Sequence, residues 1–367
     1  MLHTDIPTHG EILALTTVSE PWCVSIYTPT EVDTPTPDKN RVAIENQVKQ
    51  ALDRVEDKNA RTALSEAFAD LLDDEDYWRY QSHTLAVHAT PEQLITHRVP
   101  NRLEASTTVG DRFNIKPLLR AVTFPQSAFV LALSENAVRL VEVTADRPAQ
   151  DAQVPGLPAS LTEYLALPPL GRSPHGRLQG SEGRKVRVRQ YCRAVDLALR
   201  NVLTGLDIPL ILAATEPTAG LFRSVSSYPQ LLTEGISGNP ERLTDAELAE
   251  QARTLLDQHY ATELAELRTE FENRRSDGRG ILDLSDIARA ATYGIVHVLF
   301  VDIDAHVPGR LADDGSITQV PARDDNGPGV LDEIARRTLL SNGRVLAVRS
   351  EDIPDGAHAA AILRYTP

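Results

Sequence analysis

Residues 171–193 concentrate positive charge in an otherwise acidic protein. The whole chain carries a formal net charge of −15 at pH 7. Within this segment a single acid, Glu182, stands against seven basic residues: Arg172, Arg177, Arg184, Lys185, Arg187, Arg189 and Arg193. A local cluster of cations on an acidic protein is typical of a site that binds phosphate. The segment therefore favours RNA as a ligand.

The second half of this segment predicts the start of an amphipathic helix. Arg184 and Arg187 are three residues apart, and Arg189 and Arg193 are four apart. We expect these residues and Lys185 to line one side of the helix start. Cations near a helix N-terminus oppose the helix dipole and cost roughly 0.3 kcal/mol each. A cluster kept against that preference indicates an anionic partner, and phosphate is the expected one.

The first half of the segment is a glycine-rich loop whose polar residues could take part in chemistry. It contains His175, Arg177 and Gln179, with Gly176 and Gly180 beside them. Glycine permits backbone conformations that other residues avoid, and a glutamine amide could orient a water molecule. Gln179 cannot accept a proton at neutral pH, so alone it is a weak catalyst. Two interpretations stay open: hydrolysis assisted by Gln179, or a surface loop without chemistry.

Motifs of several enzyme classes are absent from the sequence. It contains no G-x-S-x-G, no phosphate-binding G-x-x-x-x-G-K-[ST] and no H-E-x-x-H. The acidic stretch at residues 302–306 lacks the spacing of a calcium loop, so we expect a solvated loop there. Cys23 and Cys192 are the only cysteines, and we expect free thiols. No cofactor and no metal site are predicted.

Composition limits where the protein acts and what it binds. No apolar run approaches the ~20 residues that span a bilayer, and the first residues lack the pattern of a signal peptide. A pI near 5.1 excludes a general nucleic-acid coat protein but is compatible with one confined basic face. We therefore expect a cytoplasmic protein, a monomer, that does not bind membranes.

Residues 1–122 are predicted to form an N-terminal α/β domain. An apolar strand at residues 22–28 is followed by two helices, and two short strands come next, at residues 84–88 and 93–99. The buried face of the first helix is expected to comprise four aliphatic residues, flanked by two more: Val42, Val48, Leu52 and Val55, with Ile44 and Ala51 at the flanks.

Residues 123–236 are predicted to form a middle domain that carries the basic helix. A hairpin turns at Glu135-Asn136, and a continuous apolar run at residues 208–215 is typical of a buried strand. Between them lies a long loop, then the helix. The buried side of this helix is expected to hold Val188, Cys192, Val195, Leu199, Val202 and Leu203.

Residues 237–367 are predicted to form a C-terminal domain. Thr244 and Glu247 have the spacing of a capping box, which predicts the start of a long helix. The elements that follow have the order helix, strand, helix, strand, strand. This order favours an α/β/α sandwich. The fold class is therefore α/β (α+β) in three domains.

The C-terminal part of the chain carries a resemblance to a known family. LDEIARRTLLSNGRVLAV (331–348) and IPDGAHAAAILRY (353–365) are similar to the last domain of the bacterial archaeo-eukaryotic release-factor family. ARAATYGIVHVLFVD (288–302) resembles an earlier part of that domain, and PWCVSIYTPT (21–30) resembles the start of the bacterial branch. This family includes class-I termination factors, Pelota and Balon-type hibernation factors.

The resemblance implies a fold and a place of action for the middle domain. In the family this domain is RNase H-like, and its tip loop enters the peptidyl-transferase centre of the ribosome. Termination factors carry Gly-Gly-Gln in that loop, whereas this chain has Arg177-Leu178-Gln179 at the matching place. The departure disfavours peptide release and favours a loop that acts as a plug or probe. Asn114-Ile115-Lys116 resembles part of a codon-reading motif, but its position late in the domain makes this a coincidence.

The leading hypothesis is a ribosome-binding factor that occupies the A site of idle or stalled ribosomes without chemistry, in hibernation or rescue. Ribosomal RNA would be bound by the residues of the loop and the helix: His175, Arg177, Gln179, Arg184, Lys185, Arg187, Arg189 and Arg193. The resemblance implies a translational GTPase as a further partner, with elongation factor Tu as the example. The alternative is an enzyme that hydrolyses the peptidyl-tRNA ester with Gln179.

A third hypothesis is a metal-dependent nuclease built on the middle domain. Such a site needs clustered carboxylates to hold metal ions. The hairpin strands and their turn offer only Glu135 and Glu142. This hypothesis is therefore the weakest of the three.

Overall fold

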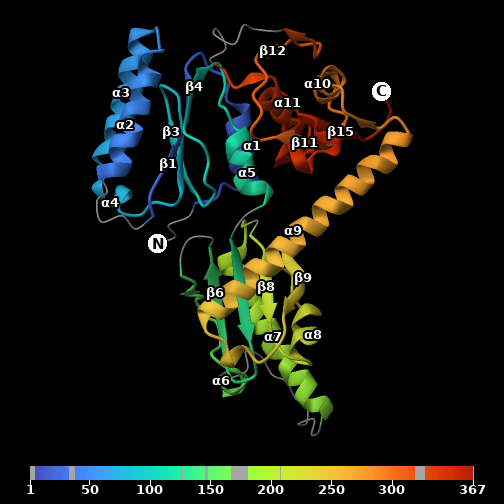
Figure 1. Cartoon of the computed structure of the whole chain (residues 1–367). Helices are drawn as coiled ribbons and strands as arrows, with labels where there is room; N and C mark the ends of the chain where they lie inside the picture. Colours follow the sequence, from blue (N-terminus) through green and yellow to red (C-terminus); the bar gives the residue numbers. More distant parts are fainter. Residues whose placement is uncertain are drawn as a thin grey trace. The chain divides into compact units, whose positions relative to one another are not determined.

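The computed structural model describes residues 5–32, 38–124, 127–144, 148–166, 181–206, 208–318 and 327–366. It confirms a mixed α/β fold with several sheets. The chain divides into two compact units: Met1–Pro125 with Tyr260–Pro367 as unit 1, and Gln126–His259 as unit 2 (Figure 1). The first and third regions predicted from the sequence fall largely in the same unit. Their division into separate domains, 1–122, 123–236 and 237–367, stays a prediction.

The N-terminal part of unit 1 is a four-stranded antiparallel sheet with the order β3-β2-β1-β4. Its strands are β1 (Cys23–Pro29), β2 (Thr84–Ala89), β3 (Leu94–Val99) and β4 (Ser106–Gly110). The helices of this part are α1 (His9–Thr17), α2 (Asp38–Leu52), α3 (Lys58–Asp73), α4 (Glu75–Trp78) and α5 (Lys116–Thr123). Figure 1 shows α2 and α3 on one face of the sheet and α1 and α5 on the other.

The predicted buried face of α2 is correct for Val48 and Val55 but wrong for Val42. Val42 is 52% exposed, whereas Ile44 and Ala51, expected at the flanks, are fully buried. The buried face runs through Ile44, Val48 and Ala51, which are spaced four and three residues apart and pack with β1 and α3 in one cluster. Spacing alone therefore identified the helix, but the position of the sheet decides which of two overlapping apolar stripes is covered.

The C-terminal part of unit 1 is a second four-stranded sheet with the order β10-β15-β11-β14, in which only the β11–β14 pair is parallel. Its strands are β10 (Gly280–Ile281), β11 (Val296–Asp302), β14 (Arg344–Val348) and β15 (Ala359–Leu363). The other elements are the end of α9 (Asp245–Ser276), α10 (Leu284–Thr292), the small pair β12 (Arg310–Leu311) and β13 (Ile317–Thr318), and α11 (Gly329–Leu340). The predicted order of helices and strands is thus present.

The two sheets of unit 1 share one hydrophobic core. Buried residues of α1 and α5, such as Ile12 and Leu118, belong to the same cluster as Ile334 of α11 and Leu299 of β11. Helix α5 comes from the N-terminal region, yet it packs along β14, the edge strand of the second sheet. The hydroxyl of Thr123 accepts a hydrogen bond from the backbone N–H of Ala347 at 3.1 Å. The N- and C-terminal regions therefore stabilise one another.

Unit 2 is built on a five-stranded sheet with the order β7-β6-β5-β8-β9. Its strands are β5 (Ala128–Leu133), β6 (Val138–Val143), β7 (Gln150–Ala152), β8 (Leu210–Ala213) and β9 (Leu231–Ile236). Strand β6 is antiparallel to both of its neighbours, and β8 is parallel to β5 and to β9. This is the strand order of an RNase H-like sheet, as the resemblance implies.

The helices of unit 2 are α6 (Leu161–Ala166), α7 (Ser181–Leu203), α8 (Thr218–Arg223) and the first part of α9. Helices α7 and α8 pack with β5 and β8 in one cluster that contains Leu131 and Leu212. Strand β9 was not predicted from the sequence. Gly235 is required there, because a Cβ atom would lie 2.5 Å from the carbonyl oxygen of Leu212.

Candidate nucleic-acid interface

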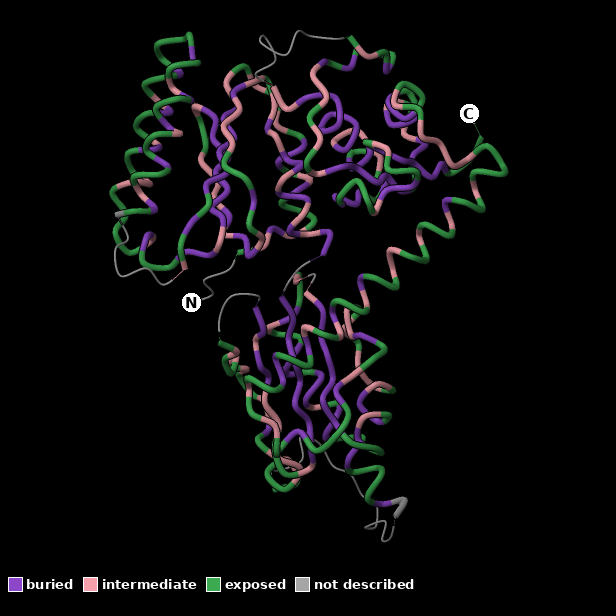
Figure 2. Tube along the Cα trace, in the orientation of Figure 1, coloured by how far each residue is buried: buried purple, intermediate pink, exposed green. Residues whose placement is uncertain are grey.

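Helix α7 buries one face against the sheet of unit 2 and exposes the other. Val188, Cys192, Val195 and Leu199 are at most 2% exposed, and they are spaced four, three and four residues apart. This stripe matches the predicted one and places α7 in the core of the unit. The first turns of α7 extend beyond the sheet (Figure 1), and Figure 2 shows them largely exposed. Side chains outside the buried stripe therefore face solvent.

All five basic residues predicted on this helix are exposed. We call them the basic surface of α7: Arg184, Lys185, Arg187, Arg189 and Arg193. The loop residues predicted to act with them, His175, Arg177 and Gln179, lie outside the residues that the structure describes. The described part of the site is therefore the helix alone.

The expectation that these residues share one side of the helix is wrong. Lys185, Arg189 and Arg193 follow one another at intervals of four residues and form one row along α7. Arg184 and Arg187 form a second, shorter row. The buried stripe, which begins at Val188, separates the two rows. The longer row is the more suitable one for following a nucleic-acid backbone.

The two rows differ in their contacts. Arg184 donates from Nη2 to a carboxylate oxygen of Glu135 at 3.0 Å and from Nε at 3.2 and 3.3 Å. Nε of Arg187 donates to the carbonyl oxygen of Gly183 at 3.2 Å. By contrast, Arg189 and Arg193 make no hydrogen bond or ion pair with any described residue. These two guanidinium groups keep their donors available for a ligand.

The row of Lys185, Arg189 and Arg193 ends at the next turn of α7. There Arg200 pairs with Asp196 at 2.8 Å. Asp196 is 3% exposed and also accepts hydrogen bonds from the backbone and hydroxyl of Ser227. Arg200 is therefore part of the structural contacts of unit 2, and the available cations are confined to the first half of the helix.

The structure offers little to a nuclease. Among the described residues, no group of three or more His, Cys, Asp or Glu side chains could hold a metal ion. Glu135 is paired with Arg184, and burial raises the pKa of Glu142. Burial also raises the pKa of the Cys23 thiol to about 11 and that of Cys192 to about 12, so neither is an activated nucleophile.

Asn114, Ile115 and Lys116 have a structural role. The backbone N–H groups of Ile115 and Lys116 both donate to Oδ1 of Asp332 on α11, at 2.8 and 2.7 Å. Nζ of Lys116 donates to the carbonyl oxygens of Asp302, at 3.0 Å, and of Ala305. Lys116 is 7% exposed. The segment joins two parts of unit 1, and its lysine is not presented to a codon.

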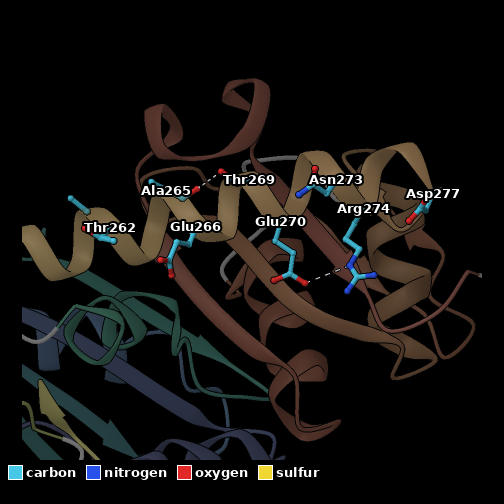
Figure 3. Close-up of a pocket in the computed structure, with 9 residues that line it drawn as sticks. Thr262, Ala265, Glu266, Thr269, Glu270, Asn273, Arg274 and Asp277 are labelled. Atoms are coloured by element: carbon cyan, nitrogen blue, oxygen red, sulfur yellow. Dashed lines mark hydrogen bonds and ion pairs between the residues drawn. The ribbon is translucent and has the colours of Figure 1, made fainter. Parts of the chain in front are cut away.

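A hollow in unit 1 lies along one face of α9. It has a volume of about 800 Å³ and is lined by α9 and the residue that follows it, including Thr262, Glu266 and Glu270 (Figure 3). Glu270 pairs with Arg274 at 3.5 Å. With a single helix as its wall, this hollow lacks the converging groups of a ligand site.

No helix in the described part of the chain is long and apolar enough to cross a membrane.

Comparisons with solved structures find several multidomain proteins of similar extent. The archaeal translation termination factor aRF1 is 14% identical, with a TM-score of 0.24 over 98% of this chain and 99% of that chain. Dom34 of S. cerevisiae, described as a translation termination-like factor, is 12% identical, with a TM-score of 0.46 over 75% of this chain and 74% of that chain. Archaeal Pelota, from a model of ribosome-bound Pelota and ABCE1, is 13% identical, with a TM-score of 0.43 over 99% and 95%.

No curated protein matches the sequence. One family model matches, that of bacterial archaeo-eukaryotic release factor family 11, over residues 125–262. The matched residues contain all of unit 2 and therefore the basic surface of α7. The match agrees with the resemblance that the sequence shows to the bacterial archaeo-eukaryotic release-factor family.

Proposed function

We propose that this protein binds ribosomal RNA through the basic surface of α7 and occupies the A site of idle or stalled ribosomes. The match of residues 125–262 to a release-factor family model supports a role in translation on the ribosome. Within that role, the described residues of the interface favour RNA binding over chemistry, because they present exposed cations.

The observation that carries the proposal is the pair Arg189 and Arg193. Both are exposed, neither has a partner among the described residues, and they lie one helical turn apart on a protein of net charge −15. A charge of −15 repels RNA as a whole, so binding depends on the few places where cations are free. Phosphate contacts from arginine position a protein on nucleic acid without reading its sequence.

The loop before α7 would then extend the contact toward the peptidyl-transferase centre. His175, Arg177 and Gln179 precede the helix directly in the sequence. Their part in binding stays a prediction, as do the delivery by a translational GTPase such as elongation factor Tu and the cytoplasmic location.

A co-sedimentation assay with vacant and translating ribosomes tests the proposal. The R189A/R193A variant is compared with R79A/R289A, which removes two exposed arginines from unit 1 that sit in short-range surface ion pairs. Both variants lose the same charge, so a nonspecific charge effect would act on them equally. We expect R189A/R193A to bind at least tenfold more weakly and R79A/R289A to bind like the wild type. Equal binding by all three proteins would refute the proposal.

Peptide release by Gln179 is distinguished in the same preparation. If the protein hydrolyses the peptidyl-tRNA ester, labelled peptide leaves stalled complexes, and Gln179→Ala abolishes the release without changing co-sedimentation. If the protein occupies the A site without chemistry, the wild type binds and the peptide stays on the tRNA.

A further inference from the structure

A second group of cations lies in unit 1, around a recess between the N- and C-terminal regions. The recess has a volume of about 450 Å³. This lies within the ~300–1,000 Å³ that is typical of small-molecule sites. Its lining brings together four basic side chains and two carboxylates: Arg102, Lys116, Arg120, Arg349, Glu104 and Asp304. In an acidic protein such an excess of positive charge in one recess is unusual.

Arg120 is the inner cation of this recess, and its position is held by the fold. Nη1 donates to the carbonyl oxygen of Ala347 on β14 at 3.2 Å. The guanidinium carbon lies 5.7 Å from the ring centroid of Phe124. Burial and the nearby charge of Arg349 both lower the pKa of Arg120. Two arginines are thus kept close enough to repel each other, although Asp304 and Asp352 offset part of this repulsion.

Arg349 is the outer cation, and it comes directly after β14. It is exposed, and its side chain makes no hydrogen bond or ion pair with any described residue. Asp304 is exposed as well. Lys116, at the base, donates to backbone carbonyls and not to a carboxylate. The recess therefore contains guanidinium donors that no acid of the described structure occupies.

The polar wall of the recess is also incompletely bonded. The side-chain oxygens of Asn101 and Asn114 are buried and have no hydrogen-bond partner among the described residues. Buried polar groups form hydrogen bonds in most proteins. An amide oxygen without a partner in the wall of a recess can therefore accept a hydrogen bond from a ligand or a water molecule.

We propose that this recess binds a terminal phosphate group, with Arg120 and Arg349 as its two guanidinium donors. Arginine pairs bind phosphate through charge-assisted hydrogen bonds of fixed geometry. A terminal phosphate fits a recess better than an internal phosphodiester does. A terminal phosphate is attached on one side only, whereas the nucleic-acid strand on both sides of an internal phosphodiester would have to fit. The volume leaves room for the group that carries the phosphate, either a small metabolite such as a nucleotide or the 5′ end of an RNA.

The site is independent of the basic surface of α7, since all its residues belong to unit 1. Isothermal titration calorimetry on the full chain tests the proposed phosphate site. The ligands are inorganic phosphate, a nucleoside 5′-monophosphate, and a short RNA with or without a 5′-phosphate. We expect the mononucleotide and the 5′-phosphorylated RNA to bind to the wild type more tightly than inorganic phosphate does. The RNA without a 5′-phosphate should bind to the wild type no more tightly than to R349Q. A stronger response to the mononucleotide or to the RNA identifies the source of the phosphate.

Two variants with opposite expected effects keep the test independent of folding. R349Q changes an exposed side chain that makes no hydrogen bond or ion pair with any described residue. Loss of its charge-assisted bond should weaken phosphate binding about tenfold. D304N removes an exposed carboxylate from the lining and should strengthen binding a few-fold. R289Q, on α10 and outside the recess, is the matched control. No phosphate binding by the wild type, or the same affinity in R349Q, D304N and R289Q, would overturn the proposal.

Discussion

The basic surface of α7 and a polar cluster around α11 place their basic side chains in opposite surroundings. The second set, which we call the α11 cluster, consists of five residues: Arg112, Lys116, Asp332, Glu333 and Arg337. On α7, Arg189 and Arg193 are exposed and unpartnered among the described residues. In the α11 cluster, Asp332 is 1% exposed, and Glu333 pairs with both Arg112 and Arg337. One set of charges is offered to solvent and the other is enclosed.

This difference separates charges that hold the fold together from charges that are available to a partner. Asp332 accepts from the backbone of residues 115 and 116, and so joins the N-terminal region to α11. Arg337 donates to the carbonyl oxygens of Leu311 and Ala312 and to the hydroxyl of Thr292. A buried group with such partners is costly to remove, whereas an exposed arginine without partners contributes little to stability.

The largest effect is expected from D332A. It leaves two buried backbone N–H groups without an acceptor, which should lower the free energy of unfolding by about 2–4 kcal/mol. Both tryptophans of the chain, Trp22 and Trp78, lie in unit 1, so tryptophan fluorescence in a denaturant titration reports on that unit. R289Q, which changes an exposed arginine of the same unit, is the contrasting variant, and its transition should coincide with that of the wild type. An equal stability of D332A and the wild type would show that the α11 cluster does not hold unit 1 together.

The next effect concerns pH. Burial raises the pKa of Asp332 from 3.8 to about 7. The folded state therefore holds a proton that the unfolded state releases between these values. The stability that this group contributes is present below pH 3.8 and is lost as the pH rises toward 7 and beyond. The wild type should lose stability relative to D332N over that window.

Comparing the wild type with D332N isolates this group from His88. Burial lowers the pKa of His88 from 6.5 to about 3, so His88 changes stability in the opposite direction over the same window. Its contribution is present in both proteins and cancels in the difference. Fluorescence titrations at several pH values from 4 to 8 measure it. A difference between the two proteins that does not vary with pH would show that Asp332 is ionised as in the unfolded chain.

The smallest effect is expected from E135Q, which releases Arg184 from its partner. The side chain of Arg184 is 69% exposed, so the ion pair contributes at most about 0.5 kcal/mol after screening by solvent. Stability should stay within that range of the wild type. Ribosome binding should tighten about twofold, because one more guanidinium becomes available and one carboxylate is neutralised. Weaker binding by E135Q would mean that Glu135 holds Arg184 in its binding position.

Sequence reasoning succeeded where a local pattern determines the outcome. The apolar segments on either side of the turn at Glu135-Asn136 predict β5 and β6, and the buried stripe of α7 places its basic residues outside. Short elements with weak patterns were missed, among them β4, α5 and β9. Helix α5 could not be identified from its own eight residues, because its stability comes from packing along β14, more than 200 residues later in the chain.

The sites divide in the same way. The basic surface of α7 is contiguous in sequence, so charge counting finds it. Arg120 and Arg349 lie far apart in the chain, and no local signal relates them. The position of the motif at residues 114–116 was the reason to set it apart from codon reading, which stays a prediction. Its bond to Asp332 depends on tertiary contacts that the sequence does not display.

The salt dependence of ribosome binding tests the central claim most directly. Binding constants are measured over a range of salt concentrations for the wild type, R189A/R193A and R79A/R289A, and their logarithms are plotted against the logarithm of the salt concentration. If Arg189 and Arg193 each contact a phosphate, the slope for R189A/R193A is shallower than that of the wild type by about two, and the slope for R79A/R289A is unchanged. Three equal slopes would contradict the account, because they would mean that the basic surface of α7 does not contact RNA phosphate.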